Sequence, residues 1–317
     1  MWSAFIVSAF VTSAFDGQKG WGTSVVDSQQ KLDIPGTEDL GPTGRPRTVF
    51  AEPAPLESHG PARIIAMVNQ KGGVGKTTSS VNLGAALGGY GRKVLLVDFD
   101  PQGALSVNLG INPHELEKSV YNLLMSPRLD PHEVIVHTEA PNVDVMPANI
   151  DLSAAEIQLV GEVAREQVLA RVLEKVADEY DVIMIDCQPS LGLLTVNALT
   201  AAHGVIIPLE TEYFALRGVA LLVETIEKVQ DRLNTGLQID GILPTMYDPR
   251  TLHAREVIQS VVSAFGDKVF ETAIRRTVKF PDSSVAAEPI TTFAPTHPGA
   301  DAYRRLAREL VARGGAP

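Results

Sequence analysis

Cysteine is almost absent from this sequence, in which Cys187 is the only thiol among 317 residues. A single cysteine cannot form an internal disulfide, and it excludes metal sites built from paired cysteines. We therefore predict a cytosolic protein that is held together by its hydrophobic core. Apolar residues make up 44% of the chain, which is enough to build a large core. Cys187 itself is expected to be a small buried residue.

Positive charge is also scarce. The 27 basic and 38 acidic residues give a net charge of −11, which argues against a protein coated in positive charge for indiscriminate nucleic-acid binding. The charge is unevenly distributed: residues 1–60 carry 4 basic and 7 acidic groups, residues 61–243 carry 13 and 23, and residues 244–317 carry 10 and 8. Any surface that binds DNA is therefore expected in the last quarter of the chain.

The sequence has no hydrophobic run long enough to suggest a membrane span. The apolar start, MWSAFIVSAFVTSAF, is broken by serines, has no preceding lysine or arginine, and is shorter than the roughly 20 residues that cross a bilayer. We expect a weakly ordered tail here, with a surface-seeking segment as the alternative. Residues 16–60 lack helical or strand periodicity, so we predict a disordered extension over 1–60 and one domain over 61–317.

From residue 61 onward, short apolar runs alternate with longer helical patterns. Runs of this kind are typical of strands buried on both faces, and they lie at 64–69, 94–100, 143–148, 182–186, 205–209 and 241–245. Helices are predicted between and after them at 77–89, 153–178, 216–233, 252–265 and 299–312. This order predicts an α/β fold with a mostly parallel, twisted sheet and helices on both faces. Ligands of such sheets bind at the carboxyl ends of the strands.

The strongest local pattern is a glycine-rich loop between the first strand and the first helix. It reads Lys71, Gly72, Gly73, Val74, Gly75, Lys76, Thr77, Thr78. The usual pattern G-x-x-x-x-G-K-[ST] would begin at Gln70, so this is a variant P-loop in which three glycines turn backbone N–H groups inward around phosphates. Lys76 would contact the β- and γ-phosphates of ATP, the Thr77 hydroxyl would bind Mg²⁺, and Thr78 could reach the α-phosphate.

Three aspartates follow predicted strands. Asp98 and Asp100 are two residues apart at the end of one strand, so both side chains share a face and could reach the nucleotide. Asp186 ends a later strand after four apolar residues, which is the placement of an aspartate that holds Mg²⁺ through its water shell. Together with Thr77, Asp98 and Asp186 are the predicted metal-binding residues.

These motifs resemble the ParA family of partition ATPases, in its chromosomal Soj-like branch, within the larger group that includes MinD. The resemblance runs from about residue 63 to the end of the chain and is carried by KGGVGKTT, LLVDFDPQG, YDVIMIDCQPSLGLLTVNALTAA, PLETEYFALRG, TMYDPRT and GADAYRRLARE. It implies a P-loop NTPase that hydrolyses ATP with Mg²⁺.

The resemblance also implies roles for individual residues. In the family the first lysine of the loop, here Lys71, crosses a dimer interface to the partner's ATP, so that ATP drives dimerisation. Asp100 would orient the attacking water, and Asp98 would support the magnesium region. Met246 and Tyr247 would lie near the adenine base. Lys71, Lys76 and Asp100 are therefore the predicted catalytic residues.

Family members bind DNA without sequence preference as ATP dimers, and a ParB-like partner stimulates their slow hydrolysis. By position, Arg250 and Lys279 match the family's DNA-contacting sites, with Arg275 and Arg276 as neighbours. The basic balance of residues 244–317 agrees with this placement, since phosphate contacts need only local positive charge. The resemblance implies a cytoplasmic, nucleoid-associated homodimer, with no membrane binding expected.

Two departures from the family pattern stand beside functional residues. Gln188 replaces the first of two prolines that usually follow the magnesium aspartate and its cysteine. Residues 279–284, KFPDSS, replace a stretch that usually resembles RLSEAP, next to the predicted DNA surface. We therefore keep three alternatives: an ATP switch for another cargo, such as a condensin-associated or cell-pole complex, a MinD-like membrane-associated ATPase, and an ATP-dependent ligase or amidase.

Overall fold

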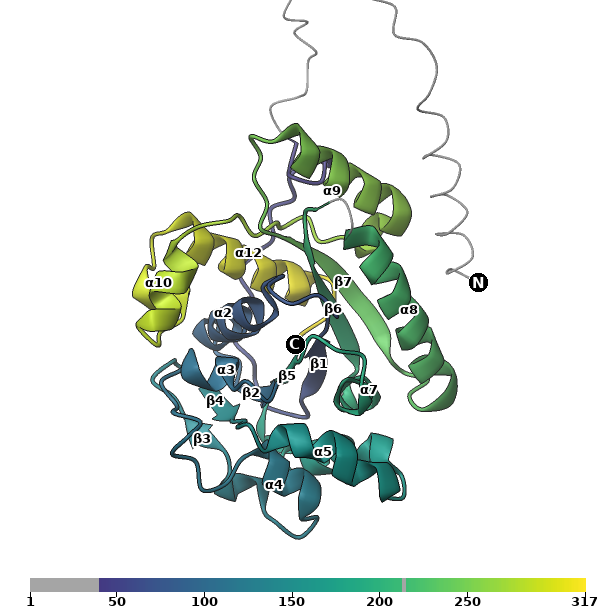
Figure 1. Ribbon diagram of the computed structural model, residues 1–317. Helices are drawn as coiled ribbons and strands as arrows, with labels where there is room; N and C mark the ends of the chain where they lie inside the picture. The colour runs from purple at the N-terminus through teal and green to yellow at the C-terminus, as the bar shows by residue number, and fades with distance from the viewer. Residues whose placement is uncertain (1–39, 213–214) are drawn as a thin grey trace, which may run out of the picture.

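The computed structural model describes residues 40–212 and 215–317, and it forms one α/β layered structure (Figure 1). Its sheet has seven strands in the order β3-β4-β2-β5-β1-β6-β7, all parallel except β3, which is antiparallel to β4. The strands are β1 (Arg63–Met67), β2 (Val94–Phe99), β3 (Val136–His137), β4 (Val143–Met146), β5 (Val182–Cys187), β6 (Gly204–Glu210) and β7 (Gln238–Thr245). The predicted mostly parallel sheet and all six predicted strands are confirmed.

Helices cover both faces of the sheet (Figure 1). One face carries α2 (Lys76–Gly89), α3 (Ala104–Val107), α10 (Lys279–Val285), α11 (Ile290–Phe293) and α12 (Pro298–Ala312). The other carries α4 (Val120–Met125), α5 (Leu152–Gln158), α6 (Val168–Glu174), α7 (Leu193–Ala201), α8 (Ala215–Arg232) and α9 (Leu252–Phe265). Short 3-10 helices lie at Pro131–Glu133, Leu159–Gly161, Arg165–Gln167, Ala177–Glu179 and Gly266–Lys268.

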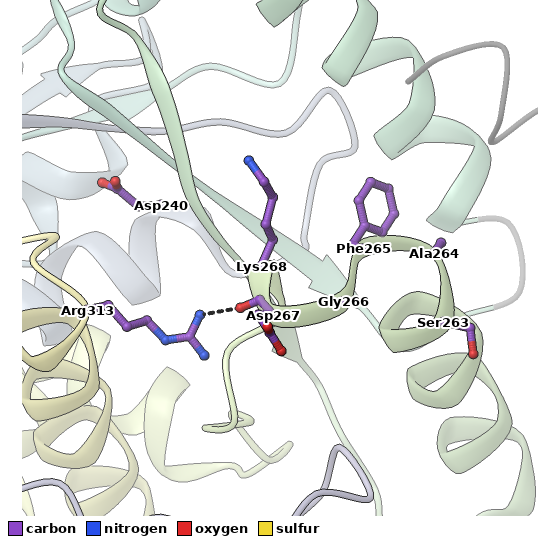
Figure 2. A pocket seen from close by; sticks show the side chains of 8 residues that line it. All are labelled: Asp240, Ser263, Ala264, Phe265, Gly266, Asp267, Lys268 and Arg313. Carbon is purple, nitrogen blue, oxygen red and sulfur yellow. Dashed lines mark hydrogen bonds between the residues drawn. The ribbon is translucent and has the colours of Figure 1, made fainter. Parts of the chain in front are cut away.

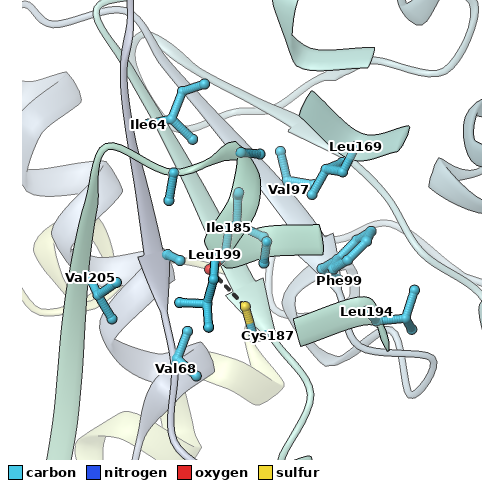
Figure 3. Packing of buried hydrophobic residues seen from close by; sticks show 14 of the residues in the cluster. Ile64, Val68, Val97, Phe99, Leu169, Ile185, Cys187, Leu194, Leu199 and Val205 are labelled. Carbon is cyan, nitrogen blue, oxygen red and sulfur yellow. Dashed lines mark hydrogen bonds between the residues drawn. The ribbon is translucent and has the colours of Figure 1, made fainter. Parts of the chain in front are cut away.

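The sheet separates two hydrophobic cores, because neighbouring residues of a strand point to opposite faces. In β2, Leu95 and Val97 face the α7 side, whereas Val94 and Leu96 face α2. Figure 3 shows the first of these cores, in which Val97, Phe99 and Ile185 pack with Leu194 and Leu199 of α7. Filling both sides explains why the strands read as continuous apolar runs rather than as alternating ones.

One predicted helix is wrong in its extent. The pattern over 153–178 predicted a single helix, but α5 ends at Gln158 and α6 begins only at Val168. Gly161 and Ala164 lie between them, and Ala164 has a left-handed backbone with φ 54°, which a continuous α-helix cannot contain. The other four predicted helices match α2, α8, α9 and α12 to within one residue at each end.

The C-terminal helix α12 uses its apolar stripe to pack on the domain. Tyr303, Leu306, Ala307 and Leu310 are all buried in the core that includes α2. The apolar surface that a membrane-lying helix would need is therefore already covered by protein. Among the residues that the structure describes, no helix is both long and apolar enough to cross a membrane.

The predicted disordered extension is described only in part, because residues 1–39 lie outside the described residues. Residues 40–60 instead follow the domain surface with defined contacts. Arg45 donates to the carbonyl of Gly266, Thr48 donates through its N–H and hydroxyl to Glu271, and Phe50 lies under the Arg305 guanidinium. The domain surface therefore extends about twenty residues further toward the N-terminus than the sequence pattern indicated.

Candidate nucleotide-binding site

The glycine-rich loop connects β1 to α2 at the carboxyl edge of the sheet. Gly73 and Gly75 have φ values of 76° and 85°, which only glycine adopts without strain. Gly75 is also the N-cap residue of α2, and no side chain caps this helix start. The first N–H groups of a 14-residue helix therefore point out of the loop without a capping side chain, as an anion-binding site requires.

Lys76 is almost completely buried at the start of α2, with 7% of its surface exposed. Its ammonium donates a long hydrogen bond of 3.3 Å to the backbone carbonyl of Lys71. Burial lowers the pKa of Lys76, while the nearby carboxylates of Asp186 and Asp100 oppose this shift. A buried cation with so weak a partner is suited to receive an anion, and a phosphate group has the required charge.

The predicted magnesium residues lie together beside the loop. The Thr77 hydroxyl donates to Asp186 Oδ2 at 2.6 Å, and Ser80 donates to Asp186 Oδ1 at 3.0 Å. Asp98 faces Asp186 across the β2–β5 pairing. Burial raises the pKa of Asp186 to about 6 and that of Asp98 to about 7. Two buried carboxylates side by side favour a divalent cation, which would offset their mutual repulsion.

Asp98 and Asp186 differ in how far they are already engaged. Asp98 Oδ2 accepts two hydrogen bonds from Ser106, through its N–H at 2.8 Å and its hydroxyl at 2.7 Å. Asp98 is therefore placed to support the site rather than to move. No group of three His, Cys, Asp or Glu side chains with metal-binding geometry occurs among the described residues. The donors available are a hydroxyl and carboxylates, which suit a Mg²⁺ ion that keeps several waters and takes phosphate oxygens.

Asp100 lies just beyond β2 and is only half-buried. Its Oδ1 accepts a hydrogen bond from the N–H of Gln102 at 3.0 Å, which orients the carboxylate at the turn. The position places a carboxylate near the buried Lys76, as the opposing effect of Asp100 on the Lys76 pKa indicates. A partly hydrated carboxylate beside the phosphate loop can hold a water molecule by hydrogen bonding.

Lys71, the first lysine of the loop, lies at the rim. Its ammonium contacts Glu210 Oε2 at 2.8 Å and Glu212 Oε2 at 2.7 Å. The hydrogen bonds that Lys71 donates to these two carboxylates raise its pKa. The described chain thus holds this lysine on its own acidic residues. Glu210 and Glu212 belong to the PLETEYFALRG motif, but no functional role was predicted for them from the sequence.

The predicted adenine-binding segment also lies next to the loop. The Thr245 hydroxyl donates to the backbone carbonyl of Val74 at 2.8 Å, which ties the end of β7 to the glycine-rich turn. Met246 follows with a left-handed backbone at φ 52° and is half-buried. Tyr247 is 5% exposed and packs with Ala254 and other apolar residues. Of the two predicted residues, Met246 is therefore the better placed to contact a base with its side chain.

The four predicted DNA-binding residues all follow β7 in the chain. Arg275 pairs with Tyr247 through a backbone bridge, and Arg276 follows it. Both are exposed, as is Arg250, whose guanidinium contacts Asp248 at 2.8 Å. Arg250, with help from Arg275, lowers the pKa of Asp248 to about 2.

Lys279 begins α10, the helix formed by the divergent KFPDSS segment. Its ammonium contacts Asp282 at 3.0 Å and lies 5.9 Å from the Phe293 ring centre. Three of the four predicted basic residues, Arg250, Arg276 and Lys279, are thus each paired with a carboxylate.

Gln188, the other departure from the family pattern, has a defined partner. Its amide donates to Glu156 Oε1 at 2.9 Å, which joins the loop after Asp186 to α5. The substitution therefore leaves β5 and Asp186 in register with β2.

A separate hollow of about 610 Å³ lies near the other end of β7 (Figure 2). Asp240 and Lys268 line it together with Arg313, which donates to the carbonyl of Asp267 at 2.8 Å. Asp240 stands near the start of β7, whereas the glycine-rich loop contacts Thr245 at its end. This hollow is therefore distinct from the phosphate loop.

Comparisons with known proteins agree with the site. A family model described as an AAA domain matches residues 62–239. Sporulation initiation inhibitor protein Soj of Bacillus subtilis is 49% identical over 252 residues, covering 80% of this chain and 99% of Soj. The chain belongs to the ParA/Soj family of partitioning ATPases. The predicted family and enzyme class are confirmed.

Two other relatives of this ParA/Soj chain come from mycobacteria. An uncharacterised protein of Mycobacterium tuberculosis is 63% identical over 276 residues, covering 87% of each chain. A Mycobacterium smegmatis structure described as cobyrinic acid a,c-diamide synthase with a bound ATP analogue and magnesium is 42% identical, with a TM-score of 0.71. It covers 80% of this chain and 96% of its own.

Proposed function

We propose that this ParA/Soj protein binds Mg-ATP, dimerises around it, and takes part in chromosome or plasmid partitioning on DNA with a ParB-like partner. The proposal rests on the different burial of the two lysines in the glycine-rich loop. Lys76 is buried at the phosphate-binding turn, while Lys71 stands at the rim with 45% of its side chain exposed. One lysine can serve its own nucleotide and the other can reach outward.

Within one subunit, the proposed chemistry follows from the contacts around the loop. The N–H groups at the start of α2 and the Lys76 ammonium would bind the β- and γ-phosphates. Thr77 and Asp186 would hold Mg²⁺, with Asp98 in support, and the ion would neutralise charge on the phosphate oxygens. Asp100 would orient the attacking water. The loop has only a half-buried carboxylate for this last task, which agrees with slow hydrolysis by the protein alone.

Between subunits, charge explains why ATP would control assembly. Two triphosphates that face each other repel, and this repulsion is strong where water is excluded. A Lys71 ammonium from each subunit, placed against the partner's phosphates, would offset the repulsion. ADP lacks the γ-phosphate and so offers the crossing lysine a weaker target. The nucleotide state would thereby set the oligomeric state.

DNA binding is proposed for the exposed basic residues beyond β7. Arg250, Arg275 and Lys279 are the contacts that we propose. Arg250 and Arg275 follow β7 on segments that the Tyr247–Arg275 bridge joins, and Lys279 begins α10. Arg250 pairs with the partly exposed Asp248 and Lys279 with the exposed Asp282, and ion pairs at the surface are weak enough for DNA phosphates to compete with them. The resulting dimer would be cytoplasmic and associated with the nucleoid.

The decisive experiment measures assembly by analytical ultracentrifugation with ADP, with ATP, and with ATP and DNA. The Asp100→Ala protein should form a stable ATP dimer because hydrolysis no longer dissolves it, whereas Lys71→Ala should remain a monomer with every nucleotide. A ParB-like protein should then increase ATP turnover by the wild type. Monomeric Asp100→Ala in saturating Mg-ATP would contradict the proposed dimer, and stimulation by a different partner would favour another cargo.

A second candidate is ATP-dependent amide formation, because the Mycobacterium smegmatis structure is described as a diamide synthase. Such an enzyme needs a carboxylate substrate near the phosphates, yet the hollow in Figure 2 lies toward the other end of β7. Turnover distinguishes the two candidates. A partitioning ATPase hydrolyses ATP without a small-molecule substrate and faster with DNA and its partner, whereas a synthase consumes ATP only when its acid substrate is present.

A further inference from the structure

Four charged groups meet at the rim of the nucleotide site. Glu210 binds the Lys71 ammonium through Oε2 at 2.8 Å, and its Oε1 lies 3.6 Å from a guanidinium nitrogen of Arg276. Glu212 provides the second contact of Lys71 at 2.7 Å. Glu210 is therefore shared by two cations, one from the phosphate loop and one from the segment beyond β7.

The fold brings these groups together along three neighbouring strands. Lys71 follows β1, Glu210 is the last residue of β6, and β6 lies between β1 and β7 in the sheet. The N–H of Arg276 is 3.4 Å from the carbonyl of Tyr247, which follows β7. Glu210 pairs with Thr245 of β7, and the contacts among the charged groups are made by side chains, so side-chain movement is enough to change them.

The two carboxylates differ in how much they depend on a cation. The Glu210 side chain is 12% exposed, whereas that of Glu212 is 56% exposed. Water can stabilise Glu212 if Lys71 leaves, but a largely buried carboxylate without a counter-ion is costly. Among the ion pairs of the described residues, Lys71 and Arg276 are the cations that contact Glu210. Arg276 is 72% exposed and has room to move closer.

We propose that Lys71 and Arg276 exchange on Glu210: the carboxylate holds Lys71 in the free subunit, and Arg276 replaces Lys71 there when the lysine crosses to the partner's nucleotide. This rests on the proposed function, in which Lys71 leaves its own subunit. Glu210 is then a positioning residue that restrains Lys71, and Arg276 is the counter-ion that makes its release possible. The assignment separates Arg276 from the proposed DNA contacts.

Under the proposed exchange, substitutions of Glu210 and of Arg276 have opposite effects on the release of Lys71. Without the Glu210 charge, Lys71 loses one of its two partners and is released more easily. Without the Arg276 charge, Glu210 attracts Lys71 alone and no cation takes its place, so release becomes harder. When both charges are absent, Lys71 should behave as it does without the Glu210 charge alone, because Arg276 acts only through Glu210. A purely structural role of either residue would instead weaken the site in both variants.

The test uses Glu210→Gln, Arg276→Gln and the double variant in the full chain, with DNA absent. The first readout is the rate at which an amine-reactive reagent modifies Lys71 in the nucleotide-free protein, followed by mass spectrometry. We expect Glu210→Gln to raise this rate and Arg276→Gln to lower it, each by about two- to fivefold as for other exposed ion pairs. The double variant should react like Glu210→Gln. Arg255→Gln, which changes an exposed arginine on α9, is the matched control and should leave the rate unchanged.

The second readout is the ATP concentration that gives half-maximal dimerisation, measured in an Asp100→Ala background. It should fall in Glu210→Gln, rise in Arg276→Gln, and in the double variant match Glu210→Gln. Shifts in the same direction for both single variants, or additive shifts in the double variant, would overturn the exchange. Failure of the Asp100→Ala parent to dimerise would overturn the proposed function instead, and the modification rates of the monomer would still decide whether Glu210 restrains Lys71.

Discussion

The buried floor of the nucleotide site and its exposed rim are stabilised by different kinds of interaction. On the floor of the site, Lys76, Asp98 and Asp186 are buried, and hydroxyl and backbone N–H groups donate short hydrogen bonds to the two aspartates. At the rim, Lys71 and Arg276 are exposed and held by ion pairs with carboxylates. Buried groups cannot rearrange cheaply, whereas exposed ion pairs exchange partners at little cost. The floor is therefore suited to bind the nucleotide and the rim to respond to it.

The largest expected effect is on the affinity for Mg-ATP, and it should differ between the two lysines of the loop. Lys76→Ala removes the cation that lies against the phosphates, so affinity for Mg-ATP should fall by about 100-fold or more, as for other buried charge-assisted contacts. Lys71→Ala, the matched control at the rim, should change the affinity of the monomer by less than about threefold. Isothermal titration calorimetry with a non-hydrolysable analogue measures both. Equal losses for the two variants would remove the distinction between floor and rim.

A smaller effect is expected for DNA. Arg250→Glu reverses one charge on the proposed DNA surface, so the ATP-loaded protein should bind DNA about tenfold more weakly, with a salt slope lower by about one. Fluorescence anisotropy at several salt concentrations gives both quantities. Asp282→Asn is an informative companion, because it frees Lys279 and should strengthen DNA binding slightly. An unchanged slope for Arg250→Glu would exclude Arg250 from the DNA surface.

The smallest expected effect is on the stability of the protein in the absence of nucleotide and magnesium. Burial raises the pKa of Asp98 to about 7 from its ordinary value of 3.8, so between these pH values the folded chain binds a proton that the unfolded chain does not. Stability should therefore fall as the pH rises through this window. Asp98→Asn removes the buried charge and should raise the melting temperature at pH 8, by roughly 2–4 °C for each kcal/mol recovered, but have little effect at pH 5.

Calorimetry in magnesium-free buffer provides this measurement. Asp100→Asn is its control, because that carboxylate is half-buried near the same strand end and should show no comparable gain at pH 8. A pH-independent gain for Asp98→Asn would mean that packing, rather than charge, is the cause.

Much of the fold and of the floor could be predicted from the sequence, because both depend on local patterns. The glycine spacing fixes the turn after β1, and the aspartates follow strands whose apolar runs are unmistakable. The break between α5 and α6 could not be predicted in this way, since Ala164 carries no sign of its left-handed backbone. The packing of residues 40–60 depends on distant partners such as Glu271.

The rim was the hardest part to predict. Lys71 and Glu210 are 139 positions apart, and Arg276 comes from a third segment, so their meeting depends on the strand order. A glutamate at the end of a strand next to β1 is the signal that could have found it. Once the strand order is known, such a residue can be placed beside the phosphate loop, but the strand order cannot be predicted from any local sequence pattern.

The burial of Cys187 has a practical consequence for labelling experiments on this protein. The thiol lies in the core beside Leu194 and Leu199 with 1% of its surface exposed, and burial raises its pKa (Figure 3). Because thiol reagents attack the exposed thiolate, the native chain is a silent background for them. A fluorescent probe attached to a cysteine newly introduced on the exposed surface of α9 would therefore report from that position alone, without a signal from the native thiol.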